Sequence, residues 1–187
     1  MEAMYQEKVS KKQLINAAIR LFLSRGYRKT SMSDIAEACS IKKPSVYHHV
    51  DSRSDLLLAV VEEVIQRFSD DVLALAYKDT VSPRDSMQAM TVATADFFTD
   101  GADDCLIAQL VYEISDTSDD LAKLLQLFFE KWTQALSHLF AAQYGDAARS
   151  HAEDCIAQVE GALLISSVTS DQAVFKRSLD RMLDLIS

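Results

Sequence analysis

Residues 30–57 read TSMSDIAEACSIKKPSVYHHVDSRSDLL, and this stretch predicts two short helices, a tight turn and the start of a third helix. Ser31 is a favoured N-cap residue, and Asp34 follows at the spacing of a capping box, with Asp in place of the usual Glu. A turn is expected at residues 40–41. Pro44 suits the first turn of the second helix, because its missing N–H would have no partner there. The apolar face of the first helix is expected from residues at helical spacing, namely Met32, Ile35, Ala36 and Cys39.

The second of these helices combines a small buried side with a polar and aromatic outer side. Val46 and Val50 are expected to be buried. The outer side is left to Lys42, Lys43, Ser45, Tyr47, His48 and His49. This composition is typical of a DNA-recognition helix, whose first residues reach base edges while those one turn later meet phosphates. In the alternative interpretation Tyr47 packs partly in the core and His49 only caps the helix.

Other helix N-termini near this stretch offer hydroxyl and basic groups. Thr30, Ser31 and Arg53 each lie close to such an N-terminus. Backbone N–H groups and the helix dipole favour phosphate at these places. We therefore expect these three residues to contact the DNA backbone.

The surrounding features occur in a characteristic order. An apolar helix ends in Gly26-Tyr27, and it is followed by Thr30-Ser31, Asp34-Ile35-Ala36-Glu37-Ala38, Ser45-Val46-Tyr47-His48-His49-Val50 and Ser52-Arg53-Ser54-Asp55-Leu56-Leu57. From Val9 to Ala59 the chain resembles the DNA-binding domain of TetR-type transcriptional regulators. It departs from that pattern at Pro44, where a Gly or small residue is usual, and at Asp51, which places a negative charge near the expected phosphate path.

The net charge of -9 is divided unevenly along the chain. Residues 1–55 hold ten Lys and Arg and six Asp and Glu, a balance of +4, whereas residues 56–187 hold nine and twenty-two, a balance of -13. A basic segment joined to an acidic body confines the attraction for phosphate to one part of the molecule. We expect a DNA-binding domain at 1–55 and a helical effector-binding and dimerisation domain at 56–187.

The fold class is predicted to be all-α. Glycine and proline are scarce, at four and two residues, and the strand-like alternation of polar and apolar residues is nearly absent. About nine helices are expected, at 10–25, 32–39, 44–49, 52–78, 83–99, 103–115, 118–143, 147–167 and 171–186. The fourth of these would connect the two domains without a flexible linker.

The segment from Asp100 resembles a C-terminal subgroup of TetR-type regulators, in the stretch Gly101–Glu113, in Trp132 on a long helix and in Glu160-Gly161-Ala162-Leu163. A cavity between helices is a usual place for a small-molecule site in such proteins. The expected lining is Phe68, Met90, Phe97, Gln109, Leu110, Tyr112, Glu113, Phe128 and Trp132. This lining favours a mainly hydrophobic, neutral or cationic ligand, although the same residues would also make an ordinary core.

The last two helices each carry a strong apolar stripe. We expect them to pair with the same helices of a second copy in a four-helix interface. The expected contact residues are Cys155, Ile156, Val159, Leu163, Phe175, Leu179, Met182, Leu183 and Ile186. Gly161 weakens its helix but lets another backbone approach. In the alternative interpretation these stripes only cover the core of one chain.

Several other classes of function lack support in the sequence. There is no Gly-rich phosphate loop, no Ser-His-Asp set and no catalytic pair of carboxylates at motif spacing, so no enzyme and no cofactor are expected. His151 and Cys155 are spaced i, i+4 but lack further ligands, so no metal site is expected. Cys105 is the cysteine most open to reactivity, although an inert buried role is favoured.

The expected compartment is the cytoplasm. No transmembrane segment or hydrophobic leader is visible, and three widely separated cysteines argue against a disulfide framework.

The resemblance implies a homodimeric repressor. Two recognition helices would bind successive major grooves of a near-palindromic DNA operator, and a small-molecule effector would release them by moving the fourth helix. Two alternatives remain open: a DNA-binding protein without an effector, and a helical ligand carrier or enzyme with a vestigial DNA-binding domain.

Overall fold

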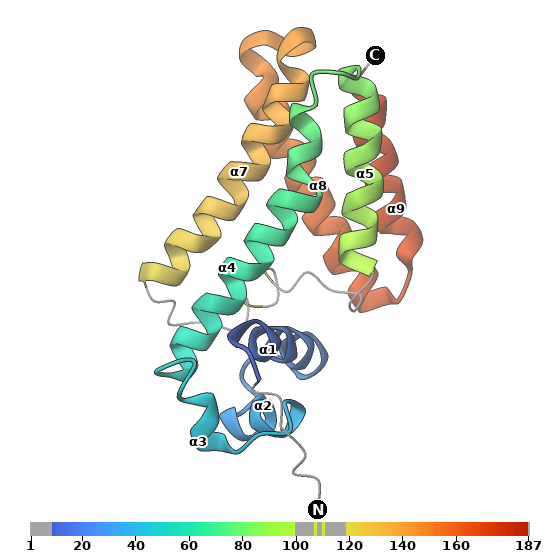
Figure 1. Ribbon diagram of the computed structural model, residues 1–187. Helices are drawn as coiled ribbons and strands as arrows, with labels where there is room; N and C mark the ends of the chain where they lie inside the picture. Colours follow the sequence, from blue (N-terminus) through green and yellow to red (C-terminus); the bar gives the residue numbers. More distant parts are fainter. Residues whose placement is uncertain (1–8, 100–106, 108–109, 111–118, 187) are drawn as a thin grey trace, which may run out of the picture. The chain divides into compact units, whose positions relative to one another are not determined.

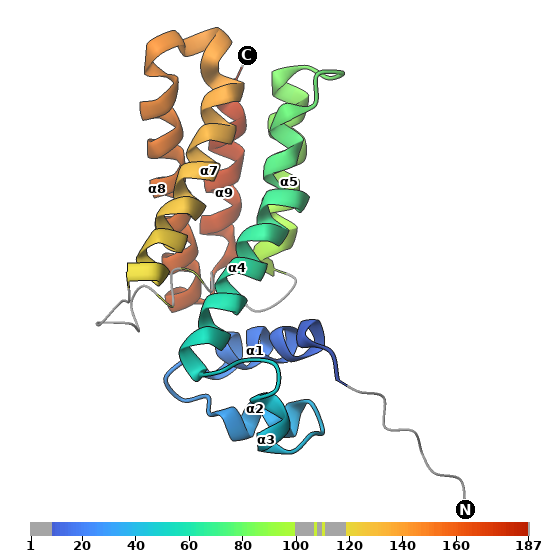
Figure 2. The same cartoon turned by 60° about the vertical axis from the view of Figure 1, so that its left-hand side comes forward.

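The computed structural model describes residues 9–99, 107, 110 and 119–186 (Figures 1 and 2). The α-helices in this part are α1 (Lys11–Arg25), α2 (Met32–Ala38), α3 (Lys43–Val46), α4 (Arg53–Asp71), α5 (Pro83–Thr99), α7 (Asp119–Tyr144), α8 (Ala148–Thr169) and α9 (Gln172–Asp184). Two short 3₁₀ helices, η1 (Leu73–Tyr77) and η2 (Gly145–Ala147), complete the set. The described residues contain no strand, so the all-α prediction is confirmed.

Most observed bounds lie within one or two residues of the expected ones, and the largest differences are at the ends of α3 and α4. α3 ends at Val46 instead of His49, and the amides of His48 and His49 donate to the carbonyls of Ser45 and Val46 in successive turns. α4 ends at Asp71 and a separate 3₁₀ helix follows it, where one helix to residue 78 was predicted. The expected helix at 103–115 lies almost entirely outside the described residues.

The chain forms two compact units, Met1–Glu63 and Val64–Ser187, which we call the N-terminal and C-terminal units. The boundary between them lies within α4, later than the domain boundary proposed from charge at residue 55. Each unit has its own hydrophobic core and is described by itself.

In the N-terminal unit, α1 to α3 and the first turns of α4 enclose a small core. Its fully buried side chains include Leu14, Ala18, Phe22, Ile35, Val46, Leu56, Val60 and Val61. α1 begins with a capping box between Ser10 and Gln13. It ends at Gly26, whose φ of 81° is readily reached by glycine and whose amide donates to the carbonyl of Phe22 at 2.8 Å. This sharp ending directs the chain into the turn before α2.

In the C-terminal unit, α8 packs against both α7 and α9, and α5 packs against α9 (Figures 1 and 2). The last turn of α9 is held by side chains from two other helices. The Arg84 guanidinium donates to the carbonyls of Leu183 and Ile186, and the Tyr144 hydroxyl donates to the carbonyl of Leu185 at 2.8 Å. These bonds satisfy carbonyls that the helix end leaves without intrahelical partners.

Within the described residues, no helix combines the length and the apolar character that crossing a bilayer requires.

Candidate nucleic-acid interface

The helix–turn–helix geometry of α2 and α3 is set by local hydrogen bonds. At the start of α2 the Ser31 hydroxyl accepts from the Asp34 amide at 3.2 Å, and the Asp34 carboxylate accepts from the Ser31 amide at 2.7 Å. The capping box predicted from the sequence is thus confirmed. After α2, Ser40 adopts a left-handed conformation with φ of 54°, and the Ile41 amide donates to the carbonyl of Ala36 at 2.9 Å. These contacts turn the chain sharply into α3.

The Asp34 carboxylate is held in its ionised form by this cap. Its pKa is lowered from the ordinary value, mainly by hydrogen bonds from the side chain and backbone of Ser31 and also by the charge of Arg25. The Arg25 guanidinium lies 3.7 Å from the carboxylate. The cap therefore keeps its strength at neutral pH.

α3 and the turn after it present the predicted recognition face to solvent. Lys42, Lys43, Tyr47 and His48 are exposed, whereas Ser45 and His49 are half-buried and Val46 is fully buried. Tyr47 is 43% exposed, so part of this side chain is open to solvent while the rest packs within the unit. The face thus offers two lysines at the start of α3 and aromatic and imidazole groups one turn later, which suits contact with a DNA groove and its phosphates.

Thr30 requires a correction to the predicted phosphate contacts. The side chain is only 2% exposed, and its hydroxyl donates to the carbonyl of Gly26 at 2.8 Å. This bond fixes the turn between α1 and α2, so the hydroxyl is not available to a phosphate. Ser31 is exposed, but its hydroxyl already donates to the Asp34 carboxylate at 2.5 Å.

Arg53 is also engaged within the N-terminal unit. Its guanidinium donates to the carbonyl of Tyr27, and its central carbon lies 4.1 Å from the centre of the Tyr27 ring. The Tyr27 ring in turn meets Phe22 edge to face at 5.3 Å. Arg53 therefore connects the start of α4 to the end of α1, and the direct phosphate contact predicted for it competes with this role.

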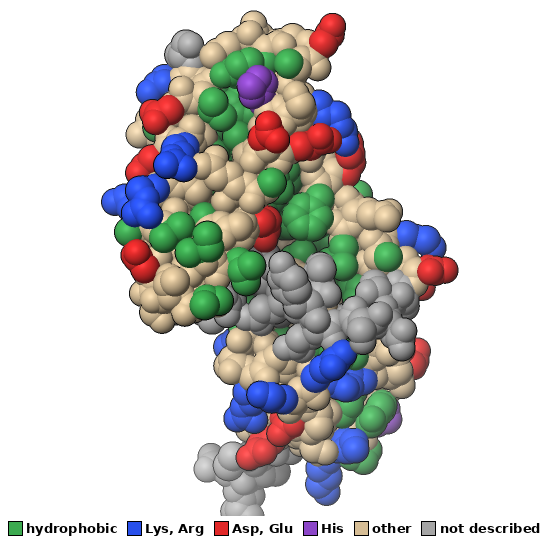
Figure 3. Space-filling view, turned by 180° about the vertical axis from the view of Figure 1, so that it is seen from behind, with side chains coloured by type: hydrophobic (Ala, Val, Ile, Leu, Met, Phe, Trp, Pro, Cys, Tyr) green, Lys and Arg blue, Asp and Glu red, His purple; other side chains and the backbone are tan. Residues whose placement is uncertain are grey.

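Two basic residues that the sequence pattern did not single out lie exposed in the same region. Arg28 and Lys29 follow Tyr27 in the turn before α2. Lys and Arg side chains stand out over this unit in Figure 3. The sequence feature that could have identified them is their position as two consecutive basic residues just before the Ser31 N-cap, because phosphate is favoured at a helix N-terminus.

In the C-terminal unit, most of the predicted effector-pocket residues that are described are buried, and the aromatic ones pack against one another. Phe68, Met90, Leu110, Phe128 and Trp132 are buried, and Phe97 is half-buried. The Phe68 ring lies 4.9 Å from Trp132, 5.2 Å from Phe128 and 5.1 Å from Phe97 between ring centres. The other predicted lining residues, Gln109, Tyr112 and Glu113, lie outside the described residues, as does Cys105.

The predicted dimer-contact residues turn out to be core residues of their own unit. Cys155, Ile156, Val159, Leu163, Phe175, Leu179, Met182 and Ile186 are all buried, and Leu183 is half-buried. The helical stripes were correctly identified, but they face α5 and α7 and are used within one chain. The exposed apolar residues of α8 are instead Leu164, Ile165 and Val168, of which Val168 is 79% exposed.

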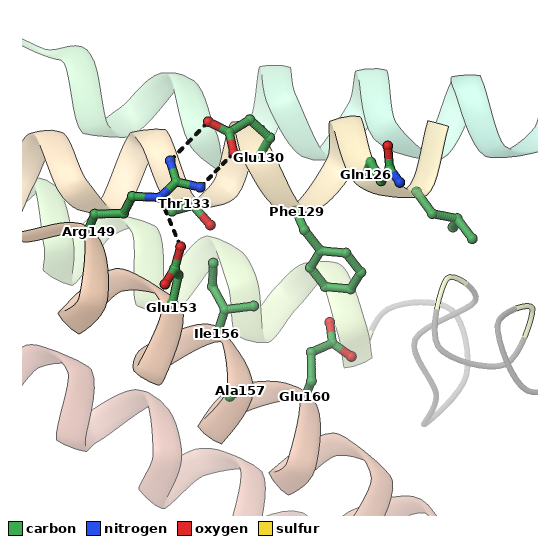
Figure 4. Close-up of a pocket in the computed structure, with 10 residues that line it drawn as sticks. Gln126, Phe129, Glu130, Thr133, Arg149, Glu153, Ile156, Ala157 and Glu160 are labelled. Carbon is green, nitrogen blue, oxygen red and sulfur yellow. Dashed lines mark hydrogen bonds and ion pairs between the residues drawn. The ribbon is translucent and has the colours of Figure 1, made fainter. Parts of the chain in front are cut away.

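An open groove of about 650 Å³ runs between α7 and α8 (Figure 4). Its apolar lining includes Leu125, Phe129 and Ile156. Arg149 of α8 closes one end by pairing with Glu130 of α7 at 2.9 Å and with Glu153 at 2.9 Å. Hydrogen bonds from Arg149 and then Gln134 lower the pKa of Glu130 to about 2.

The His151 and Cys155 pair has an ordinary structural role. Among the described residues no three His, Cys, Asp or Glu side chains come together as metal ligands. The His151 ring lies 4.0 Å from the Tyr144 ring, and Cys155 is buried. Burial, and then the charge of Asp154, raise the pKa of the Cys155 thiol to about 11, so the thiol stays protonated and unreactive.

Known proteins share this sequence pattern and fold. Residues 14–60 match the family model for bacterial regulatory proteins of the tetR family, and residues 83–180 match that for the C-terminal domain of LmrA/YxaF-like transcriptional regulators. An uncharacterised HTH-type transcriptional regulator in the lacX 3' region of Lactococcus lactis is 25% identical over 184 residues, covering 94% of this chain and 92% of that protein. The HTH-type transcriptional regulator BetI of Rhizobium meliloti is 27% identical over 168 residues, covering 88% and 81%.

The crystal structure of a TetR transcriptional regulator from Legionella pneumophila superimposes with a TM-score of 0.84 at 21% identity, covering 97% of this chain and all of that one. The C-terminal match alone spans more than half of the chain, and the N-terminal match coincides with the helix–turn–helix described above. The chain therefore belongs to the TetR family of DNA-binding transcriptional regulators, with a C-terminal domain of the LmrA/YxaF-like kind.

Proposed function

We propose that this TetR-family regulator is a homodimeric repressor that leaves a near-palindromic operator when a small molecule binds its C-terminal unit. The family is not one of enzymes, so the proposal concerns binding equilibria and not a reaction. The observation that carries it is the outer face of α3 and the turn after it, where Lys42, Lys43 and His48 are exposed and Tyr47 is partly open to solvent.

The charge distribution supports operator binding through the N-terminal unit. The basic side chains of this unit attract phosphate, and the acidic remainder of the chain repels DNA elsewhere. Lys42, Lys43 and Ser45 are the proposed base-edge contacts, and Tyr47, His48 and His49 are the proposed phosphate contacts. Arg28 and Lys29 are proposed phosphate contacts beside α2. Ser31, whose amide and hydroxyl both donate to Asp34, would contact a phosphate only by giving up part of this cap.

The exposed face of α8 supports a homodimer. Leu164, Ile165 and Val168 form an apolar strip that continues past Gly161, where an added Cβ would meet no described residue of this chain within 4 Å. A glycine within a helix destabilises the helix by about 1 kcal/mol relative to alanine. No contact among the described residues of one chain requires a glycine at this position. Close approach of a second α8 would use this site, so the proposed interface moves from the buried stripes to this exposed face.

The aromatic cluster of the C-terminal unit supports an effector site. Phe68, Phe97, Phe128 and Trp132 gather large rings at one place, and effector binding there would act on α4, which carries Phe68 and begins in the N-terminal unit. By linkage the effector must bind the DNA-incompetent state more tightly than the DNA-bound state. The alternative of an effector-independent DNA-binding protein predicts that no small molecule changes operator affinity.

The experiment is operator selection followed by effector screening. An operator is first selected from random DNA duplexes with the full-length protein, and its inverted repeats are compared with a half-site spacing of about 34–36 Å. Compounds that raise the melting temperature are then tested for release of that operator. Selected DNA without a repeat would contradict the dimeric repressor, and stabilising compounds that all leave operator affinity unchanged would contradict the effector response.

A further inference from the structure

Trp132 is the only tryptophan of the chain and has no exposed surface. Its indole N–H is buried, and no acceptor among the described residues pairs with it. An unpaired buried donor loses its hydrogen bonds to water without replacement, and buried tryptophans normally find a partner. A phenylalanine here would avoid this penalty, so the N–H group itself calls for an explanation.

Three of the groups around this indole are hydrocarbon rings. Between ring centres, Phe68 lies at 4.9 Å, Phe128 at 5.7 Å and Phe98 at 6.4 Å from Trp132. None of these neighbours can neutralise a charge. An anion placed among them would remain unpaired in a medium of low dielectric, which is strongly unfavourable. An ammonium group could contact the ring faces, but it has no lone pair to accept a hydrogen bond from the indole N–H.

Two half-buried rings border the cluster. Phe97 lies 5.1 Å from Phe68, and Phe129 lies 5.1 Å from Phe128. Phe129 also lines the open groove between α7 and α8, where Figure 4 shows its ring. A route for a ligand from this groove to the cluster would pass the Phe129 ring.

We propose that the Trp132 cluster binds an uncharged aromatic molecule whose hydrogen-bond acceptor, a carbonyl or ether oxygen or a ring nitrogen, pairs with the indole N–H. This inference rests on the proposed function, in which a small molecule binds the C-terminal unit. It narrows the class of ligand, because the sequence predicted a neutral or a cationic molecule without deciding between them. The acceptor fixes the orientation of the ligand, and the rings of Phe68, Phe98 and Phe128 provide apolar contact.

The test replaces only the N–H group. Because Trp132 is the sole tryptophan, β-(3-benzothienyl)alanine incorporated in its place exchanges N–H for sulfur in the full-length protein with little change of shape. Benzophenone and 1,1-diphenylethylene serve as probes, since they differ chiefly in C=O against C=CH₂. The ratio of their dissociation constants is measured by calorimetry in both proteins, which forms a double-mutant cycle for the proposed bond.

We expect the preference for benzophenone to be about threefold to tenfold greater in the natural protein than in the analogue protein. An equal ratio in both proteins would overturn the proposal, as would the failure of benzophenone to bind up to its solubility limit. Diphenylacetate, an anion that carries the same two phenyl rings, should bind at least tenfold more weakly than benzophenone, and equal binding would count against the neutral class.

A second measurement needs no ligand. If the N–H is unpaired in the free protein, its removal costs no hydrogen bond, so the analogue protein should melt at the same temperature as the natural protein or higher. A lower melting temperature of the analogue protein would show that the N–H has a partner and would overturn the proposal. If the analogue protein does not fold, Trp132→Phe, which also lacks the N–H donor, takes its place. The ratio of the two dissociation constants is then measured in that variant. Operator affinity with and without benzophenone is measured separately, so that a failed regulatory response is distinguished from a failed binding site.

Discussion

The guanidinium of Arg53 lies over the ring of Tyr27, 4.1 Å from its centre, and also donates to the Tyr27 carbonyl. Arg53 opens α4 and Tyr27 follows the end of α1, so this one pair fixes two ends of the helix–turn–helix framework. The sequence predicted a phosphate contact for Arg53, whereas in the structure this side chain holds Tyr27. Substitution of Arg53 tests which of the two roles is more important.

Arg53→Lys keeps the charge but loses the planar stack and the forked geometry of the guanidinium. We expect the free energy of unfolding of the N-terminal unit to fall by about 1–3 kcal/mol, from the lost cation–π contact and charge-assisted hydrogen bond. Thermal and urea unfolding measure this change. Arg20→Lys on the exposed side of α1 is the matched control and should leave stability within about 0.5 kcal/mol of the natural protein. Unchanged stability of Arg53→Lys with weakened DNA binding would instead favour a phosphate contact.

Lys43→Ala tests the recognition face. Lys43 is exposed at the start of α3, so its loss should weaken operator binding by about 1–3 kcal/mol if it reads a base and less if it meets only phosphate. In the phosphate case the slope of log affinity against log salt becomes shallower by about one unit. Fluorescence anisotropy over a salt series gives both quantities. Lys176→Ala, which removes an exposed lysine of α9, is the control. An equal loss of operator affinity in this variant would show a non-specific effect of charge.

Val168→Glu tests the proposed dimer face. Val168 is 79% exposed in the single chain, so a charge there should leave the folding of the C-terminal unit nearly unchanged. In a dimer built on α8 the same carboxylate would be buried next to its symmetry mate, and assembly should fail. Sedimentation at micromolar concentration measures the outcome. Val92→Glu on α5, where the valine is 57% exposed, is the control, and a dimer that survives Val168→Glu but not Val92→Glu would place the interface on α5.

The Glu130–Arg149 pair predicts a pH effect on the C-terminal unit. The pKa of Glu130 is lowered from 4.5 to about 2 in the folded chain, chiefly by the hydrogen bond from Arg149. A carboxylate with a depressed folded pKa contributes stability above pH 4.5, and this contribution is lost as the pH falls towards 2. Both side chains are solvent-accessible, so the effect on the melting temperature should be small. Glu130→Gln should flatten the decline of melting temperature over this range. Glu62→Gln on the exposed side of α4 is the control, and equal slopes for all three proteins would contradict the effect.

Local sequence determined most of the framework. The capping box of Ser31 and Asp34, the stop at Gly26 and the turn after α2 follow from short-range hydrogen bonds and backbone preferences, which depend on neighbours within a few residues. The same holds for Pro83 at the start of α5 and for the apolar stripes of α7 to α9. The family resemblance of the first sixty residues rests on this local order, and the match to the family model confirms it.

Tertiary structure decided how individual side chains are used. A helical stripe shows that one face is apolar but not which neighbour covers it, so the stripes of α8 and α9 fitted a dimer interface as well as they fitted the core of one chain. The positions of Thr30 and Arg53 beside helix N-termini likewise suited phosphate, until the folded turn at Gly26 and Tyr27 gave both side chains internal partners. The unpaired indole N–H of Trp132 could not be seen in the sequence at all, because it depends on which rings from α4, α5 and α7 surround it. Such choices depend on contacts between residues far apart in the chain, and the periodicity of a single helix carries no information about them.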